Sequence, residues 1–362
     1  MRNLSLLAVS AFVLVPIAIC PIAPNFSAIA QTNPSRANIS ELLKRGRDLW
    51  QKNDIPGAIE AYRQAAALDP KNSRIQTSIG FLLTQQKNYA DAINFLQTAT
   101  QLDNRNVRAY VALGYAYTQS GNFPAALTAY RYAAALEPKN PEVLQSIGYV
   151  QTQQNDLSEA TKTYQQVLQM SPRDVKAYLN LGYVLKRQGN FKAATELYMQ
   201  ADKVAPLNAD IWFALGSVLA DQNQPEEAVA KYKRVLQINP RHPEANLEIG
   251  RVLQKQGDLT GALSAYRRAA SSNRKSTAPL WAIARLYSQQ YSIVEAIVEF
   301  RKIIDIDPND ADAHLELAKA LAKQQRKDEA VKNAEQAEKL YNRTSNAQGL
   351  AEARKLLESL KS

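Results

Sequence analysis

Small and aromatic residues recur along this chain of 362 residues at a fixed distance of 34 residues. A ladder of glycines, which ends in two alanines, begins at Gly46. A ladder of alanines begins twelve residues later at Ala58, and a mostly aromatic ladder begins four residues beyond that at Tyr62. A fixed period of this length predicts a solenoid of stacked repeats rather than a set of separate globular domains.

Each repeat also carries the apolar pattern of an amphipathic helix. Positions 4, 7, 8 and 11 are apolar or small, which is the i, i+3, i+4, i+7 spacing of one helix face. In the sixth repeat these positions hold Trp212, Leu215, Gly216 and Leu219. A glycine inside a helix costs about 1 kcal/mol relative to alanine, so its recurrence indicates that two helix backbones approach closely there. We expect the aromatic ladder to fill the space beside that contact.

Turn residues divide each repeat into two helices. The middle of most repeats holds Gly or Asn, often followed by Asn or Asp, as in Gly121-Asn122 and Asn155-Asp156. Gly and Asn tolerate the left-handed conformation that ends many helices, and Asn and Asp accept hydrogen bonds from the first free amides of the next helix. A proline such as Pro138 follows the second helix. The pattern therefore predicts a helix–turn–helix unit.

The third repeat, residues 107–140, carries Tyr110, Leu113, Gly114, Tyr117, Ala126, Tyr130, Ala133 and Pro138. With these residues it resembles the tetratricopeptide repeat, and the resemblance implies an all-α, right-handed superhelical solenoid. Leu350, Leu356, Leu357 and Leu360 form a helical stripe in the tail, so a C-terminal capping helix is expected over 345–362. The nine predicted units are 39–72, 73–106, 107–140, 141–174, 175–208, 209–242, 243–276, 277–310 and 311–344.

The N-terminal thirty residues have the order of a secretory signal peptide. Arg2 precedes an apolar run from Leu4 to Cys20, and Ala28-Ile29-Ala30 provides a small-residue cleavage pattern. We predict a signal peptide over 1–30, a disordered leader over 31–38, and export to the periplasm or the extracellular space. The alternative is an uncleaved N-terminal anchor; after cleavage no stable membrane span is expected.

In the proteins that this repeat resembles, positions 2, 5, 9, 12 and 13 of the first helix line a concave groove. The second to fourth repeats share one aromatic-Thr-Gln set at positions 9, 12 and 13, and the fifth keeps the aromatic residue beside two basic ones. Basic residues, interspersed with acidic ones, follow in the later repeats. The candidate groove residues are Phe81, Thr84, Gln85, Tyr115, Thr118, Gln119, Tyr149, Thr152, Gln153, Tyr183, Lys186, Arg187, Arg251, Lys255, Arg285 and Lys319.

These residues fit two kinds of ligand. Aromatic rings spaced by one repeat can anchor apolar side chains of an extended peptide, while Gln and Thr bond its backbone. The same groups could instead stack sugar rings along a polysaccharide. A third interpretation is that the rings only pack against neighbouring repeats. The basic residues favour a partner protein with an acidic segment, or an anionic polysaccharide, whereas nucleic acid would require a denser basic stripe.

Composition narrows the chemistry further. Lys and Arg number 44 against 34 Asp and Glu, for a net charge of +10, and the single Cys and two His exclude a disulfide framework and a zinc cluster. His242 and His314 have no companion residues for catalysis at a useful spacing, so both are expected to be structural. No phosphate loop or hydrolase motif is present. We therefore predict no catalytic, metal or cofactor site, and a non-catalytic scaffold or assembly factor that binds an extended peptide or partner protein; the alternative is a polysaccharide-binding or polysaccharide-export accessory protein.

Overall fold

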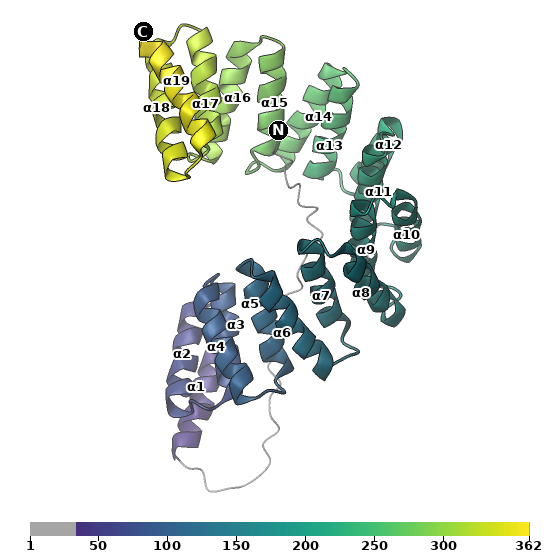
Figure 1. Cartoon of the computed structure of the whole chain (residues 1–362), viewed down its shortest axis with the longest axis vertical. Coiled ribbons are helices and arrows are strands. Elements are labelled where there is room, and N and C mark those ends of the chain that lie inside the picture. Colours follow the sequence, from purple (N-terminus) through teal and green to yellow (C-terminus); the bar gives the residue numbers. More distant parts are fainter. Residues whose placement is uncertain (1–33, 362) are drawn as a thin grey trace. The chain divides into compact units, whose positions relative to one another are not determined.

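The computed structural model describes residues 34–361, and this part of the chain consists of α-helices joined by short turns, without a β-strand (Figure 1). The predicted signal peptide, its cleavage site and residues 31–33 lie outside the described residues. Between Pro34 and Lys361 no helix is both long enough and apolar enough to cross a membrane. The prediction of an all-α solenoid of helix pairs is confirmed.

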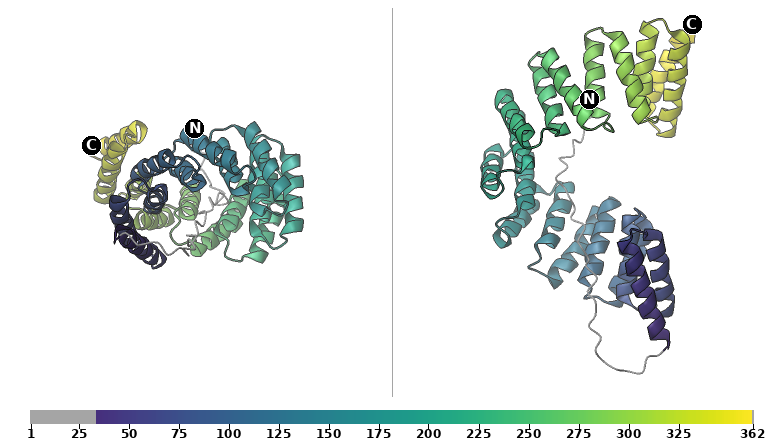
Figure 2. Two further views of the ribbon diagram at one scale, coloured as in Figure 1. Left: turned by 90° about the horizontal axis from the view of Figure 1, so that it is seen from below. Right: turned by 180° about the vertical axis from the view of Figure 1, so that it is seen from behind.

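Consecutive helices pack as antiparallel pairs, and each pair corresponds to one repeat (Figures 1 and 2). We call the first helix of a repeat its A helix and the second its B helix. The A helices are α1 (Pro34–Gln51), α3 (Ser73–Gln85), α5 (Val107–Gln119), α7 (Pro141–Gln153), α9 (Val175–Arg187), α11 (Ala209–Asp221), α13 (Pro243–Lys255), α15 (Ala278–Gln289) and α17 (Ala311–Lys323). The B helices are α2 (Ile55–Leu68), α4 (Tyr89–Leu102), α6 (Phe123–Leu136), α8 (Leu157–Met170), α10 (Phe191–Val204), α12 (Pro225–Ile238), α14 (Leu259–Ser272), α16 (Ile293–Ile306) and α18 (Lys327–Arg343), and α19 (Ala347–Lys361) follows them.

The helices form two compact units. The first contains α1 to α10 and ends at Val204, and the second begins at Ala205 and contains α11 to α19. Within each unit a helix packs mainly against the helices just before and after it, as expected when each repeat buries its apolar face only against its neighbours. The right-handed superhelix stays a prediction.

The first helix begins earlier than the sequence analysis predicts. Residues 34–38, which were expected to belong to a disordered leader, form the first turn of α1. Pro34 occupies the first helical position, where its missing amide hydrogen costs nothing. Between Pro34 and Gly46 the sequence contains no other proline or glycine, so nothing interrupts the start of the helix.

The predicted contact between the glycine ladder and the aromatic ladder is present in the core. A methyl group added at Gly114 would lie 2.7 Å from the ring of Tyr130, and one added at Gly148 would lie 2.7 Å from the ring of Tyr164. Both rings are fully buried. Glycine therefore recurs at this position because a side chain there would occupy the volume of the tyrosine ring.

The turns within the repeats have the predicted geometry. Gly121 and Asn155 adopt positive φ angles, 79° and 64°, at the end of an A helix. The side chain of Asn122 then accepts a hydrogen bond from the amide of Ala125, and that of Asp156 accepts one from Glu159. In each turn the residue with positive φ ends the A helix, and the Asn or Asp that follows it caps the start of the B helix.

The last helix, α19, packs against α17 and α18. Apolar residues including Leu357 and Leu360 are buried there, and Gly349 lies against the ring of Tyr341 in the same way as the ladder glycines. Ion pairs add to this packing: Lys319 of α17 contacts Glu352 at 2.7 Å. The C-terminal helix thus covers a surface of the ninth repeat that another repeat would otherwise cover.

Candidate binding surface on the A helices

One stripe of each A helix in the second to fifth repeats faces away from the core. Positions 2, 9 and 13 are separated by seven and eleven residues, which are close to whole numbers of helical turns, so their side chains share a face. Positions 2 and 13 are exposed and position 9 is half-buried in all four helices. We call these residues the aromatic stripe; they are Arg74, Phe81, Gln85, Arg108, Tyr115, Gln119, Glu142, Tyr149, Gln153, Lys176, Tyr183 and Arg187.

The rings of the stripe are partly packed and partly open. Phe81 meets Trp50 edge-on, with ring centroids 6.0 Å apart and an interplanar angle of 83°. Burial raises the pKa of Tyr115 and of Tyr149 above the usual value for a phenol. Each ring is therefore held by its neighbours on one side and can contact a partner on the other, which combines the packing and the binding interpretations.

The three threonines predicted to line the groove are buried, and this part of the prediction is wrong. Thr84, Thr118 and Thr152 are no more than 6% exposed. Their hydroxyls donate to backbone carbonyls of their own helices, at 2.6 Å to Phe81 and 2.7 Å to Gly114 in the first two cases, and at 2.7 Å to Gly148 in the third. Position 12 follows directly after core position 11, so its side chain turns toward the packed face and satisfies its hydroxyl locally. Gln85, Gln119 and Gln153, one residue further on, are exposed.

Arg187 connects two repeats instead of projecting freely. Its guanidinium donates to the carbonyl oxygen of Thr152 at 3.0 Å and to Oδ1 of Asn155 at 2.8 Å. Both acceptors lie at the C-terminal end of α7, where carbonyl groups lack helical partners and favour a positive charge. Lys186, its neighbour in the sequence, is half-buried.

The basic residues predicted for the later part of the groove are largely compensated by nearby groups. Arg251 lies 2.7 Å from Glu248, and Lys319 lies 2.7 Å from both Glu316 and Glu352. The guanidinium of Arg285 lies over the ring of Trp281, 5.2 Å from its centroid. Lys255 is exposed.

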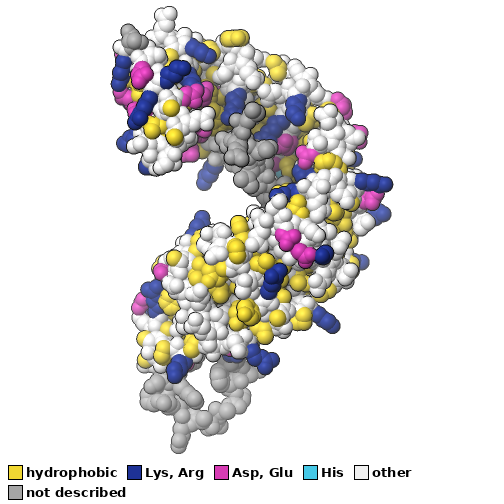
Figure 3. Space-filling view, in the orientation of Figure 1, with side chains coloured by type: hydrophobic (Ala, Val, Ile, Leu, Met, Phe, Trp, Pro, Cys, Tyr) yellow, Lys and Arg dark blue, Asp and Glu magenta, His cyan; other side chains and the backbone are white. Residues whose placement is uncertain are grey.

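The charge of the four stripe helices therefore differs from that of the A helices of the second unit. The four helices that carry the aromatic stripe contain five Lys and Arg and one acidic residue. The four A helices of the second unit contain five Lys and Arg and six acidic residues. Figure 3 shows hydrophobic side chains gathered over the α3–α6 part of the first unit, and mixed positive and negative side chains over α17–α19. The surplus of positive charge lies with the rings, not in the later repeats as predicted.

Three stripe residues at position 2 were not among the predicted site residues. Arg74, Arg108 and Lys176 are exposed, and within residues 34–361 no carboxylate pairs with any of them. They follow the same period of 34 residues as the rings, with Glu142 as the exception, so the repeat pattern itself was the signal that could have identified them.

The two histidines have structural roles. The Nδ1 atom of His242 accepts the amide hydrogen of Ala245 at 3.2 Å and so caps α13. His314 is buried, with its ring nitrogens 3.1 Å from Oδ1 of Asn333 and 3.3 Å from the carbonyl oxygen of Pro308. Among the described residues no three His, Cys, Asp or Glu side chains are grouped as metal ligands would be.

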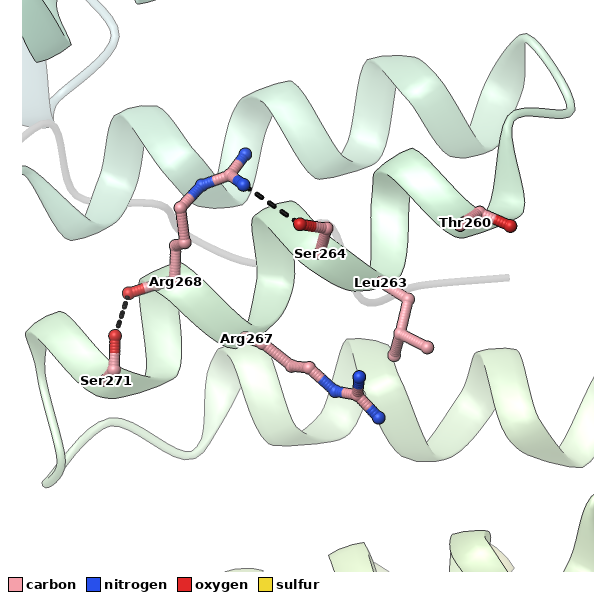
Figure 4. A pocket seen from close by; sticks show the side chains of 6 residues that line it. All are labelled: Thr260, Leu263, Ser264, Arg267, Arg268 and Ser271. Atoms are coloured by element: carbon pink, nitrogen blue, oxygen red, sulfur yellow. Dashed lines mark hydrogen bonds between the residues drawn. The ribbon is translucent and has the colours of Figure 1, made fainter.

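A shallow depression also lies along α14, lined by Thr260, Leu263, Ser264, Arg267, Arg268 and Ser271 (Figure 4). All six residues come from one helix. Two of its polar groups are already engaged, because Arg268 donates to the hydroxyl of Ser264 at 2.9 Å and Arg267 donates to the hydroxyl of Tyr287 at 2.7 Å. The depression is the outer side of a single helix, and it provides no converging set of groups for a small ligand.

Comparison with known proteins identifies related repeats. The family model described as the cilia and flagella-associated protein 70 C-terminal domain matches residues 139–356. Two tetratricopeptide repeat models match residues 83–146 and 43–107. No curated protein sequence matches the chain.

Solved structures are similar to this chain at low sequence identity. A tetratricopeptide repeat protein from Parabacteroides merdae is 18% identical, with a TM-score of 0.59, over 69% of this chain and 98% of the other. PilF of Pseudomonas aeruginosa is 21% identical, with a TM-score of 0.46, over 61% of this chain and 100% of the other. At 18% identity the match to the Parabacteroides merdae protein shows the fold alone.

Proposed function

Because the chain belongs to the tetratricopeptide repeat family, we propose that it is a non-catalytic scaffold that binds an extended segment of a partner protein along the aromatic stripe. One observation carries this proposal. Four consecutive A helices each present a half-buried ring between two exposed polar or charged side chains. Rings that are already held in place lose little side-chain freedom on binding, and such rigid aromatic residues are the usual anchors of protein interfaces.

The stripe favours a segment that alternates apolar and acidic residues. Apolar side chains of the partner would contact Phe81, Tyr115, Tyr149 and Tyr183, one ring for each repeat. The amides of Gln85, Gln119 and Gln153 would bond its backbone, and its carboxylates would pair with Arg74, Arg108 and Lys176. The exposed cations would also accelerate the encounter with an acidic partner at low ionic strength.

The polysaccharide alternative has less support. Sugar recognition needs several hydroxyl and amide groups beside the rings, but the three threonine hydroxyls of the predicted set are buried and already bonded to backbone carbonyls. No comparison points to a glycan ligand. Binding of long oligosaccharides remains the outcome that would favour this alternative over a protein partner.

We further propose that the scaffold acts in an exported compartment, and that its first thirty residues are removed on export. The basic start, the apolar run and the small residues before Gln31 support this assignment. The mass of the protein recovered from the exported fraction tests it directly. A mature chain that begins at Gln31 is expected, and a full-length mass in the membrane fraction would show an uncleaved anchor.

Affinity capture followed by peptide binding tests the main proposal. The native chain and a variant with Tyr115→Ala, Tyr149→Ala and Tyr183→Ala are compared as baits, and the bound segment of each partner is then made as a synthetic peptide for titration. We expect the variant to bind that peptide at least tenfold more weakly. A control variant, Tyr132→Ala, removes a ring that is 56% exposed on the B helix α6 and should bind normally.

Two results would contradict the proposal. The first is equal binding by the triple variant and the native chain, both folded by circular dichroism, which would mean that the rings only pack. The second is a partner set of glycans, whose affinity rises with chain length in the native protein and falls in the variant.

A further inference from the structure

The outer face of the eighth repeat differs from that of every other repeat in the chain. Positions 15, 18 and 22 of a repeat lie in the turn and on the outer side of the B helix. In the eighth repeat they are Tyr291, Val294 and Val298. At position 15 the other eight repeats carry Asn53, Lys87, Gly121, Asn155, Gly189, Asn223, Gly257 and Gln325. At position 18 they carry Pro56, Ala90, Pro124, Ser158, Lys192, Glu226, Thr260 and Asp328. At position 22 they carry Glu60, Asn94, Thr128, Lys162, Glu196, Ala230, Ser264 and Lys332.

Val294 and Val298 form an exposed apolar face on α16, and Tyr291 lies in the turn just before this helix. Tyr291 is 86% exposed, Val294 60% and Val298 46%. Val294 and Val298 are four residues apart in α16, so they lie on one side of the helix. Because eight repeats of the same chain place polar, small or proline residues at the same exposed positions, packing within the solenoid does not require large apolar side chains there.

Tyr291 also adopts a backbone conformation that its side chain disfavours. Its φ angle is +60°, and among the described residues with positive φ it is the only aromatic one. The other repeats use mostly Gly, Asn or other flexible residues at this turn. A bulky residue retained in the left-handed region at an exposed site indicates a role beyond folding.

Charged residues continue this face in a symmetric order. Relative to Val298, Glu295 lies three residues before it and Arg301 three residues after it. Val294 and Lys302 are placed four residues before and after it. All of these side chains are exposed. An acidic and a basic residue at equal distances from one central valine make the face complementary to itself in the antiparallel orientation.

We infer that this face of α16 binds a second copy of the chain, through a two-fold axis that passes beside Val298. In that arrangement Val298 meets Val298 of the second copy, and Val294 packs on the aliphatic part of Lys302 of the second copy. Glu295 pairs with Arg301 of the second copy. A two-fold contact makes each of these interactions twice.

The existing ion pairs are compatible with this contact. Arg301 contacts Glu329 at 2.8 Å through Nη2, and its guanidinium has further donors for a second carboxylate. Lys302 contacts Glu299 at 2.7 Å through its ammonium group, which leaves the aliphatic part of its side chain for Val294. This surface lies on a B helix of the second unit, so it is separate from the aromatic stripe and does not depend on the proposed function.

Sedimentation velocity of the full chain over a range of concentrations tests the inference. The native chain should form a dimer in a concentration-dependent manner. Val298→Glu should weaken dimerisation at least tenfold, because it places two carboxylates against each other at the axis. A matched control, Met199→Glu, adds the same charge at a methionine that is 57% exposed in the first unit and should dimerise like the native chain.

A charge exchange distinguishes this contact from any other dimer. Glu295→Arg alone places like charges against Arg301 of the second copy and should weaken the dimer. The combination of Glu295→Arg with Arg301→Glu restores opposite charges and should recover most of the native affinity, with circular dichroism confirming that each variant is folded. A native chain that stays monomeric at every concentration would overturn the inference. So would a Val298→Glu variant that dimerises normally, or a charge exchange without recovery.

Discussion

The two units of this chain share one repeat and one core but present different surfaces on their A helices. At position 9 the second to fifth repeats of the first unit carry Phe81, Tyr115, Tyr149 and Tyr183, whereas the second unit carries Ser217, Arg251, Arg285 and Lys319. The glycine and alanine ladders run through both units almost unchanged. The comparison shows that packing restricts only the buried positions of the repeat, while the exposed stripe is free to carry aromatic residues in one unit and compensated charges in the other.

The units also differ in how their B helices begin. In the first unit an Asp or Asn side chain accepts an amide hydrogen at the start of every B helix, at Asp54, Asn88, Asn122, Asp156 and Asn190. In the second unit Asp258 does so for α14, but Gln224, Ser292 and Arg326 form no such bond. The first unit is thus the more regular one at its surface turns as well as along its stripe.

Removing one ladder ring should have the largest effect, and it tests whether the two units are stabilised separately. Tyr164 is fully buried in the first unit, and replacing a buried aromatic residue by alanine costs about 3–5 kcal/mol. Because each repeat contacts only its neighbours, Tyr164→Ala should remove hydrogen-exchange protection from α7 to α9 while α17 to α19 keep theirs. Exchange measured by mass spectrometry on proteolytic peptides gives the result.

The matched variant is Tyr232→Ala, which removes the corresponding ring from the second unit. It should produce the reverse pattern, with protection lost around α12 and retained in α3 to α5. If either variant lost protection evenly along the whole chain, the description as two compact units would be wrong in energetic terms.

Reversing the exposed charges of the aromatic stripe should have the next largest effect, and it acts on binding rather than stability. Arg74→Glu, Arg108→Glu and Lys176→Glu together should weaken binding of an acidic partner segment about 10- to 100-fold, because three attractive contacts become repulsive. The control makes the same charge change in the A helices of the second unit, with Lys255→Glu, Arg285→Glu and Lys323→Glu. Titration at two salt concentrations should show a shallower salt dependence only in the stripe variant. Equal losses in both variants would mean that net charge, not the stripe, controls affinity.

High pH should destabilise both units, by a smaller free energy than the loss of one ladder ring. Burial raises the pKa of Tyr266 to about 12, and burial also raises the pKa of Tyr130 and Tyr164. An unfolded tyrosine ionises near pH 10, so the stabilisation from keeping the Tyr266 phenol neutral is fully present below pH 10 and is lost as the pH rises through 12. For Tyr266 the loss by pH 11 is about 1 kcal/mol.

Urea unfolding of Tyr266→Phe at pH 8 and pH 11 checks this sign. The variant loses the hydrogen bond from its hydroxyl to Oε1 of Gln254, 2.7 Å in the native chain, which costs about 1 kcal/mol at pH 8. Its stability should then fall less than that of the native chain between the two pH values. An identical fall in both proteins would show that Tyr266 does not contribute to the alkaline transition.

The buried half of the structure could be predicted from the sequence because it repeats. Gly148 and Tyr164 belong to ladders that every repeat must satisfy to stack, so their contact follows from the period and from helix geometry. The turn at Asn155-Asp156 was predictable for the same reason, since its two residues have local conformational roles that do not depend on the neighbouring repeats.

The exposed half could be predicted only in part because it depends on small rotations and on partners from other repeats. Thr118 lies one position from the exposed Gln119, but a rotation of about 100° turns its hydroxyl into the core. Arg187 was expected to face a ligand, but its acceptors at Thr152 and Asn155 belong to the preceding repeat. Lys319 is compensated by Glu352 of α19, which lies outside the repeats.

The smallest expected effect is a gain in stability at one poorly capped helix of the second unit. Gln224 precedes α12 with φ −110° and ψ 72°, close to the −83° and 68° of Asp156 before α8, but it forms no side-chain cap. Gln224→Asp should supply the missing acceptor after Asn223, in the same Asn-Asp pair that the fourth repeat uses, and stabilise the chain by about 0.5–1 kcal/mol. The reciprocal change in the first unit, Asn122→Ala, should destabilise it by a similar amount because its bond to the amide of Ala125 is lost. Urea unfolding of both variants decides the point: if capping explains the difference between the units, the two free energies change in opposite directions, and a Gln224→Asp variant no more stable than the native chain would assign the difference to another cause.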